Sequence, residues 1–158
     1  MFNHNEFGLW GEEQAQEFLK AKKLKVLQSN FETKSGEIDI VCLQTVRAAK
    51  WQLKQLLKEE KRENSDFLKT EIRKQIAQKQ YESKEDLLVF VEVKTRSQKS
   101  AVFLRPQNAV DTAKQNKYQL LANAYASKNQ LELPTRFDIV EVVEEDGKAK
   151  INHIENAF

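Results

Sequence analysis

The run of apolar residues from Leu87 to Thr95, LLVFVEVKT, constrains the fold more than any other feature of the sequence. Its valines favour a β-strand, and a strand that is apolar on both faces is typical of the interior of a sheet. We therefore expect a central strand here. Because side chains alternate along a strand, Glu92 and Lys94 should lie on one face and Val93 on the other.

The residues before this strand predict one helix and two strands. Apolar residues recur at helical spacing from about Glu6 to Lys23, which predicts an amphipathic helix. Alternating apolar positions predict a strand in residues 24–33. The pair Ser35-Gly36 marks a turn, and the segment GEIDIVCL that follows it predicts a second strand.

The residues after the central strand predict one helix and two further strands. The helix should begin at Asp111, a suitable N-cap, and end near Lys128. The segments TRFDIVEVV and KAKINHI predict strands joined by a turn at Asp146-Gly147. The order of all these elements predicts an α/β or α+β protein with helices packed on a mixed β-sheet.

Residues 45–86 do not follow this pattern. They contain no glycine or proline and are dense in Lys, Gln, Glu and Arg. Two sets of apolar residues recur at helical spacing, and Asn64-Ser65-Asp66 between them could cap the second helix. We predict a helical hairpin inserted between two strands. A single long helix is the alternative, but at 1.5 Å per residue it would leave the strand ends far apart.

Length and composition indicate an ordinary globular protein. The 158 residues suit one domain, residues 1–158, that contains the inserted hairpin. No stretch approaches the roughly 18–20 apolar residues of a membrane span, and the first residues lack the features of a secretory signal. Cys42 is the only cysteine, which excludes an internal disulfide and a cysteine-based zinc site. These features favour a cytoplasmic protein without a membrane partner.

The net charge of +2 and the isoelectric point near 8.5 make the chain mildly basic. A duplex-binding protein often has a clearer basic excess, because neutralising phosphates supplies most of its non-specific affinity. Charge alone therefore favours a nucleic-acid partner only slightly.

Charged residues on the predicted strands form the candidate site. Glu92 and Lys94 are costly beside a valine-rich run unless they are functional or paired, and a cross-strand ion pair is the simpler alternative. Asp39 faces away from Ile38 and Ile40, and it can approach Glu92 if their strands are neighbours. Two converging carboxylates repel each other, and a divalent cation such as Mg²⁺, which prefers oxygen ligands, is the usual remedy. For Asp39 alone, a solvated position after a turn is the simpler interpretation.

The combination of an acid on one strand and an E-x-K motif on the next is the pattern of the PD-(D/E)xK nuclease fold. Here Asp39 is the acid, and Glu92-Val93-Lys94 is the motif. The wider sequence resembles the bacterial YraN family within that fold. The resembling stretches are GLWGEEQAQEFL, NFETKSGEIDIV, LLVFVEVKTR, AVDTAKQNKYQLLANAYA, RFDIVEVV and INHIENAF. They cover, in order, nearly all of the chain outside residues 45–86.

The resemblance implies a restriction-endonuclease-like α/β fold with a metal-dependent site. It implies that Asp39 and Glu92 hold Mg²⁺ or Mn²⁺, with the carbonyl of Val93 as a further ligand. Lys94 matches the active-site lysine of the fold. The catalytic set implied in this way is Glu12, Asp39, Glu92 and Lys94.

The first helix contributes Glu12 to that set. Glu12 matches a helix acid that, in related Holliday-junction resolvases, helps to hold the metal. Its neighbour Glu13 is the alternative if the helix register differs by one residue.

The function implied is that of a Mg²⁺-dependent endonuclease acting on branched or structured DNA. The metal would lower the pKa of a bound water for attack on a phosphodiester, and Lys94 could position that water or stabilise phosphate charge. The candidates for contact with the phosphate backbone are Arg96, Lys99, Lys114 and Lys117. Simple solvation is the alternative for each of these four. A catalytically silent nucleic-acid-binding or protein-interaction module on the same fold is the alternative function.

Two segments depart from the family's pattern. The first is the insertion at residues 45–86, which could serve as a homodimer contact, a DNA-embracing arm or a self-packed decoration. The second is SAVFLRP, which lacks the glycine expected after the catalytic strand and faces the substrate in the family.

Other polar residues are expected to be structural. Asp138 should pair with Arg136 or with lysines across the sheet. His4 and His153 are far apart in the sequence and are expected to be exposed.

Overall fold

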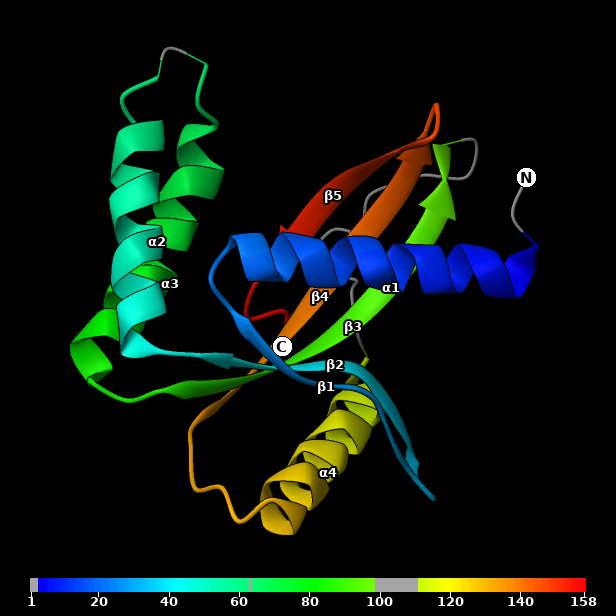
Figure 1. The fold of residues 1–158 in the computed structure, drawn as a ribbon. Helices are drawn as coiled ribbons and strands as arrows, with labels where there is room; N and C mark the ends of the chain where they lie inside the picture. Colours follow the sequence, from blue (N-terminus) through cyan, green and yellow to red (C-terminus); the bar gives the residue numbers. More distant parts are fainter. Residues whose placement is uncertain (1–2, 63, 99–110) are drawn as a thin grey trace.

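The computed structural model describes residues 3–62, 64–98 and 111–158, which form a five-stranded sheet flanked by four helices (Figure 1). The elements are α1 (His4–Ala21), β1 (Lys25–Thr33), β2 (Gly36–Gln44), α2 (Val46–Glu59), α3 (Phe67–Ser83), β3 (Leu87–Ser97), α4 (Thr112–Lys128), β4 (Thr135–Glu145) and β5 (Lys148–Ile154). The architecture is α/β with a mixed sheet, as the sequence predicts, and it is consistent with a restriction-endonuclease-like fold.

The order of strands in the sheet follows the chain, β1-β2-β3-β4-β5. Neighbouring strands are antiparallel except β3 and β4, which are parallel. A parallel pair needs a long crossover, and this one contains α4. β3 is the central strand, and its first five residues, 87–91, are buried, which confirms the prediction from its valine-rich sequence.

Apolar side chains on the two faces of the sheet form separate cores. α1 covers one face, where Leu19 and Val89 belong to the same buried cluster. α4 covers the other face, where the ring of Tyr125 meets that of Phe90 edge-on at 5.8 Å. Figure 1 shows the two helices on opposite sides of the sheet. Val89 and Phe90 are adjacent on β3, so strand alternation sends one side chain into each core.

α1 crosses the central strand at Gly11, which is buried. A Cβ atom at this position would lie 1.8 Å from Oγ1 of Thr95 on β3. Only glycine therefore allows the helix to approach the strand this closely. The contact places the next residue of α1, Glu12, directly above the strands.

β2 and β3 separate before either strand ends. Their last pair is Ile40 with Val91, whereas β1 and β2 stay paired to Thr33 and Gly36. β3 meanwhile continues beside β4 as far as Ser97. Figure 1 shows the β1–β2 hairpin curving away from β3 beyond this point. The divergence opens a space between two strands that are neighbours elsewhere.

Residues between β2 and β3 form two antiparallel helices, as predicted, and not one long helix. Thr45 is the N-cap of α2, and Asp66, at the predicted position, is the N-cap of α3. The strand ends that flank the hairpin, Gln44 and Leu87, are directly paired in the sheet. α3 exposes three large apolar side chains, those of Phe67, Leu68 and Ile72. A homodimer contact through residues 45–86 stays a prediction.

No helix within the described residues has an apolar stretch long enough to pass through a lipid bilayer.

Candidate active site

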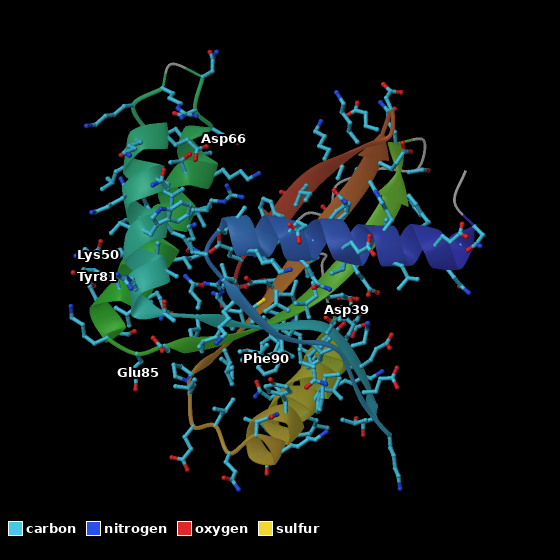
Figure 2. All side chains as sticks on the ribbon, in the orientation of Figure 1. Asp39, Lys50, Asp66, Tyr81, Glu85 and Phe90 are labelled. Carbon is cyan, nitrogen blue, oxygen red and sulfur yellow. The ribbon has the colours of Figure 1, made fainter. Side chains whose placement is uncertain are left out.

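Asp39 and Glu92 lie where β2 leaves β3. They lie one step beyond the last pair of the two strands, Ile40 with Val91. The Oδ2 atom of Asp39 accepts a hydrogen bond of 2.7 Å from the backbone N–H of Val93. The carboxylate of Asp39 thus accepts the hydrogen bond that a backbone carbonyl would accept if the pairing of β2 and β3 continued. Figure 2 shows Asp39 between α1 and α4 at this divergence.

The surroundings of Asp39 oppose its negative charge. Burial raises the pKa of Asp39 to about 6, and the hydrogen bond from Val93 only partly offsets this effect. The negative charges of Glu12, Glu92 and Glu37 raise its pKa further. The charge of Asp39 is therefore opposed by acids on α1, β2 and β3, although these elements are far apart in the sequence.

Glu92 has one satisfied and one unsatisfied carboxylate oxygen. Its Oε1 atom pairs with Nζ of Lys114 on α4 at 2.7 Å. Its Oε2 atom is buried and has no hydrogen-bond partner among the described residues. A buried carboxylate oxygen without a hydrogen-bond partner is costly, so this atom is a candidate for a ligand contact, beside the interaction of Glu92 with Tyr118 that raises the pKa of Tyr118.

Lys94 and Arg96 follow Glu92 on the same face of β3. Both are half-buried, and within the described residues neither makes a hydrogen bond or an ion pair. The side chains of Lys94 and Arg96 are therefore available to a ligand that lies along β3 beyond Glu92. Lys99, the third predicted cation of this stretch, lies outside the described residues, as does the SAVFLRP segment.

Glu12 and Glu13 differ clearly in their positions on α1. Glu13 is exposed, whereas Glu12 is half-buried and its Oε2 atom accepts a hydrogen bond of 3.4 Å from the side chain of Asn30. Of these two acids, Glu12 is the one whose charge acts on Asp39. The helix register is therefore the one in which Glu12, and not Glu13, lies on the side of α1 nearer to Asp39.

Lys117 and Tyr118 of α4 line a cleft beside the carboxylates. The cleft has a volume of about 450 Å³ and lies between α4 and the β1–β2 hairpin, with Lys114 on its wall. A Cβ atom on Gly36 would lie 2.4 Å from the Cε atom of Lys117, so this glycine leaves room for the lysine. Burial raises the pKa of Tyr118, and the charge of Glu92 raises it further. Sequence reasoning missed Tyr118, which had no signal beyond its helical spacing.

The donor set fits a magnesium ion better than a metal that requires many protein ligands. Within the described residues, no three side chains of His, Cys, Asp or Glu are close enough to hold a metal ion together. Mg²⁺ is commonly held by one or two carboxylates and several waters. The unsatisfied Oε2 atom of Glu92 and the crowded carboxylate of Asp39 match that need. The carbonyl of Val93 stays a predicted ligand, since the observed contact of Val93 is through its N–H.

A second group of buried charges lies on β4 and β5. Asp138 is bound by Arg136 through two contacts of 2.8 Å, which confirms the predicted pair. His153 is also buried, with Nε2 at 2.8 Å from Asp138 and Nδ1 at 2.8 Å from Nζ of Lys22. The expectation that His153 is exposed is therefore wrong. These residues pair with one another in a structural network, in which Nη1 of Arg136 lies 3.7 Å from Glu155 and makes no hydrogen bond among the described residues.

The comparisons with known proteins agree on one family. The model of the uncharacterised protein family UPF0102 matches residues 11–142. The chain is 35% identical over 156 residues to a UPF0102 protein of Syntrophomonas wolfei, across 98% of this chain and 99% of that protein. It is 32% identical over 158 residues to UPF0102 protein FP2501 of Flavobacterium psychrophilum, across 100% and 98% of the two chains. The chain belongs to the UPF0102 family, which is the YraN family that its motifs resemble.

Proposed function

We propose that the protein is a Mg²⁺-dependent endonuclease that hydrolyses phosphodiester bonds in structured DNA. The observation that carries the proposal is the pair of carboxylates, Asp39 and Glu92, at the divergence of β2 and β3. One of them has a buried oxygen without a partner, and the other has its pKa raised to about 6. Such an acidic pair is poorly stabilised by the protein alone, which favours a cation as the missing partner.

The chemistry requires a cation and a positioned water. A divalent metal supplies Lewis acidity, which lowers the pKa of a water ligand and neutralises phosphate charge. Asp39 and Glu92 would hold this ion, and Glu12 would add negative charge from α1. Branched DNA as the preferred substrate rests on likeness among relatives of one fold.

Lys94 is the residue of this chain best placed to act on the phosphate. It shares a face of β3 with Glu92, and it makes no ion pair within the described part of the chain. An ammonium group there would stabilise negative charge that develops on the phosphate oxygens. Lys117 and Arg96 would contact neighbouring phosphates, since Lys117 lines the cleft with Lys114, Arg96 lies four residues beyond Glu92 on β3, and both keep part of their surface exposed.

Cleavage assays on single-stranded, duplex and four-way-junction DNA with Mg²⁺ or Mn²⁺ test the proposal. We expect Asp39→Asn and Glu92→Gln each to reduce cleavage by about a hundredfold or more, because each change removes a ligand of the ion. Glu13→Gln is the matched control, since Glu13 is an exposed acid beside Glu12, and it should retain full activity.

Cleavage that survives in both strand variants would assign the activity to another site or a contaminant. A wild-type protein that binds DNA tightly without cutting it would favour the silent binding module. Circular dichroism on each variant separates loss of the site from loss of the fold.

A further inference from the structure

The solvent face of α2 carries a row of cations. Arg47, Lys50, Lys54 and Lys58 are spaced three or four residues apart and are all exposed, whereas Ala48, Ala49 and Gln52 on the opposite face are buried. Residues so spaced lie on one side of a helix. We call these four residues the α2 basic face. At 1.5 Å per residue its cations follow one another at about 5 Å intervals along the helix axis.

Carboxylates do not compensate this face. Within the described residues, none of its four cations is in an ion pair. The acids of the hairpin are engaged elsewhere: Glu60 and Glu71 bind Lys74, and Asp66 caps α3. Glu82 accepts a hydrogen bond from Gln78, and Glu59 lines a cleft together with Arg73.

The charge of the hairpin differs in sign from that of the rest of the chain. Residues 46–83 contain ten Lys or Arg and six Asp or Glu, a net charge of +4 in a chain whose total is +2. The remainder therefore carries −2. The helical hairpin is thus clearly basic although the net charge of the whole chain is small. A basic surface of this kind is typical of a binding site for a polyanion.

The apolar side of α2 is covered, which bears on the class of partner. A helix that lies on a membrane needs a wide apolar face beside its basic one. In α2 the face opposite the cations packs inside the protein, and Leu57 is the one large apolar side chain of this helix that is strongly exposed. Figure 2 shows Lys50 on the outer side of the hairpin, close to Tyr81, whose ring it contacts. Nucleic acid fits this arrangement better than a lipid surface does.

We propose that the α2 basic face binds the phosphodiester backbone of nucleic acid at a second surface, separate from the carboxylate pair. Thr45, the N-cap of α2, lies six residue steps along the chain from Asp39, which corresponds to about 20 Å of extended chain. The second surface therefore holds a different segment of the nucleic acid from the one beside Asp39. The choice of DNA as the ligand rests on the proposed function, but binding by this face requires no cleavage.

Fluorescence anisotropy of a labelled 20-base-pair duplex in metal-free buffer, over a series of salt concentrations, tests the proposal. The variant combines Lys50→Gln, Lys54→Gln and Lys58→Gln. We expect its affinity to fall by about tenfold and the slope of log K against log salt to shrink by about 3, because each lost phosphate contact removes about one released counterion. The control combines Lys25→Gln, Lys128→Gln and Lys148→Gln, which remove the same charge from exposed positions on other elements.

Equal losses in the two triple variants would overturn the proposal, because they would show an effect of total charge alone. It would also be overturned if the α2 variant bound DNA normally but lost affinity for vesicles of phosphatidylserine and phosphatidylcholine. The metal-free buffer separates this proposal from the nuclease proposal, because binding is measured under conditions without cleavage. The α2 variant should lose affinity and salt slope whether or not the wild-type protein cleaves DNA when metal is added.

Discussion

The sheet holds two aspartates below its surface, Asp138 fully buried and Asp39 half-buried, and their surroundings affect them in opposite ways. Asp138 on β4 accepts two contacts from Arg136, one from His153 and one from the backbone N–H of Asn156. Burial alone would raise the pKa of Asp138, but Arg136 and His153 outweigh that effect and hold it below its ordinary range. Asp39 on β2 has one backbone donor and three acids nearby, and its pKa rises to about 6.

The difference extends to the neighbours of each aspartate. Around Asp138 the network continues to Glu155, which pairs with Lys22 at 2.9 Å, so charges of both signs alternate. Around Asp39 the described ion pair is that of Glu92 with Lys114, whose side chain is 39% exposed. A buried acid paired with cations is held in its charged form, whereas a partly buried acid among other acids has its charged form disfavoured.

The largest effect on stability is expected at Asp138. Asp138→Ala should lower the free energy of unfolding by about 3–5 kcal/mol, because it leaves the buried Arg136 and His153 without their shared partner. Urea denaturation at pH 7.5 measures this loss, and Glu132→Ala, at an exposed loop position, is the control. A loss below about 1 kcal/mol would show that the network contributes little and would remove the contrast with Asp39.

A change of the opposite sign is expected at Asp39. Because the pKa of Asp39 is raised in the folded state, the folded protein holds this proton more tightly than the unfolded chain does. The wild-type protein therefore loses stability as the pH rises through about 4 to 6. Asp39→Asn should stabilise the metal-free protein at pH 7.5 by about 1–3 kcal/mol, with the gain vanishing near pH 4.

Urea denaturation in EDTA at both pH values measures this gain. A variant that is destabilised equally at pH 4 and pH 7.5 would contradict the prediction. That result would show that the hydrogen bond to Val93 matters more than the buried charge.

The smallest effect is expected at Lys114. Lys114→Met removes the positive charge from Oε1 of Glu92, so Mn²⁺ should bind about three- to tenfold more tightly at pH 8, which lies above the raised pKa of Asp39. Isothermal titration calorimetry measures the affinity of each variant for Mn²⁺. Lys117→Met is the control, because Lys117 lies three residues further along α4 and makes no ion pair with Glu92. Weaker Mn²⁺ binding in Lys114→Met would show that the lysine supports the metal site and does not compete with it.

Local patterns predicted the elements of the fold correctly. The alternation of side chains in LLVFVEVKT depends only on neighbouring residues. The same holds for Asp66 as the N-cap of α3 and for the turn at Asp146-Gly147. The pairing of Asp39 with Glu92 needed one further assumption, that β2 and β3 are neighbours, and the sheet order confirms it.

Contacts between distant segments could not be predicted in the same way. His153 is buried because Lys22, which lies 131 residues earlier, reaches its ring, and no local pattern marks such a contact. Lys114 was predicted to face a phosphate, and its partner in the structure is Glu92. Which partner Lys114 meets depends on where α4 crosses the sheet, and the spacing of residues along α4 does not determine that position. The roles predicted for the site residues stay predictions until cleavage is measured.

The direct pairing of Gln44 with Leu87 has a consequence for how such chains can vary over evolutionary time. Because the two strand ends are already side by side, the 42 residues between them could be lost, shortened or lengthened without a change in the register of β2 and β3. Asp39 and its neighbouring acids lie at the opposite end of the paired segment of β2 and β3, next to Ile40 and Val91. Descendants of one ancestor could therefore vary or lose the helical hairpin while the acids around Asp39 keep their positions.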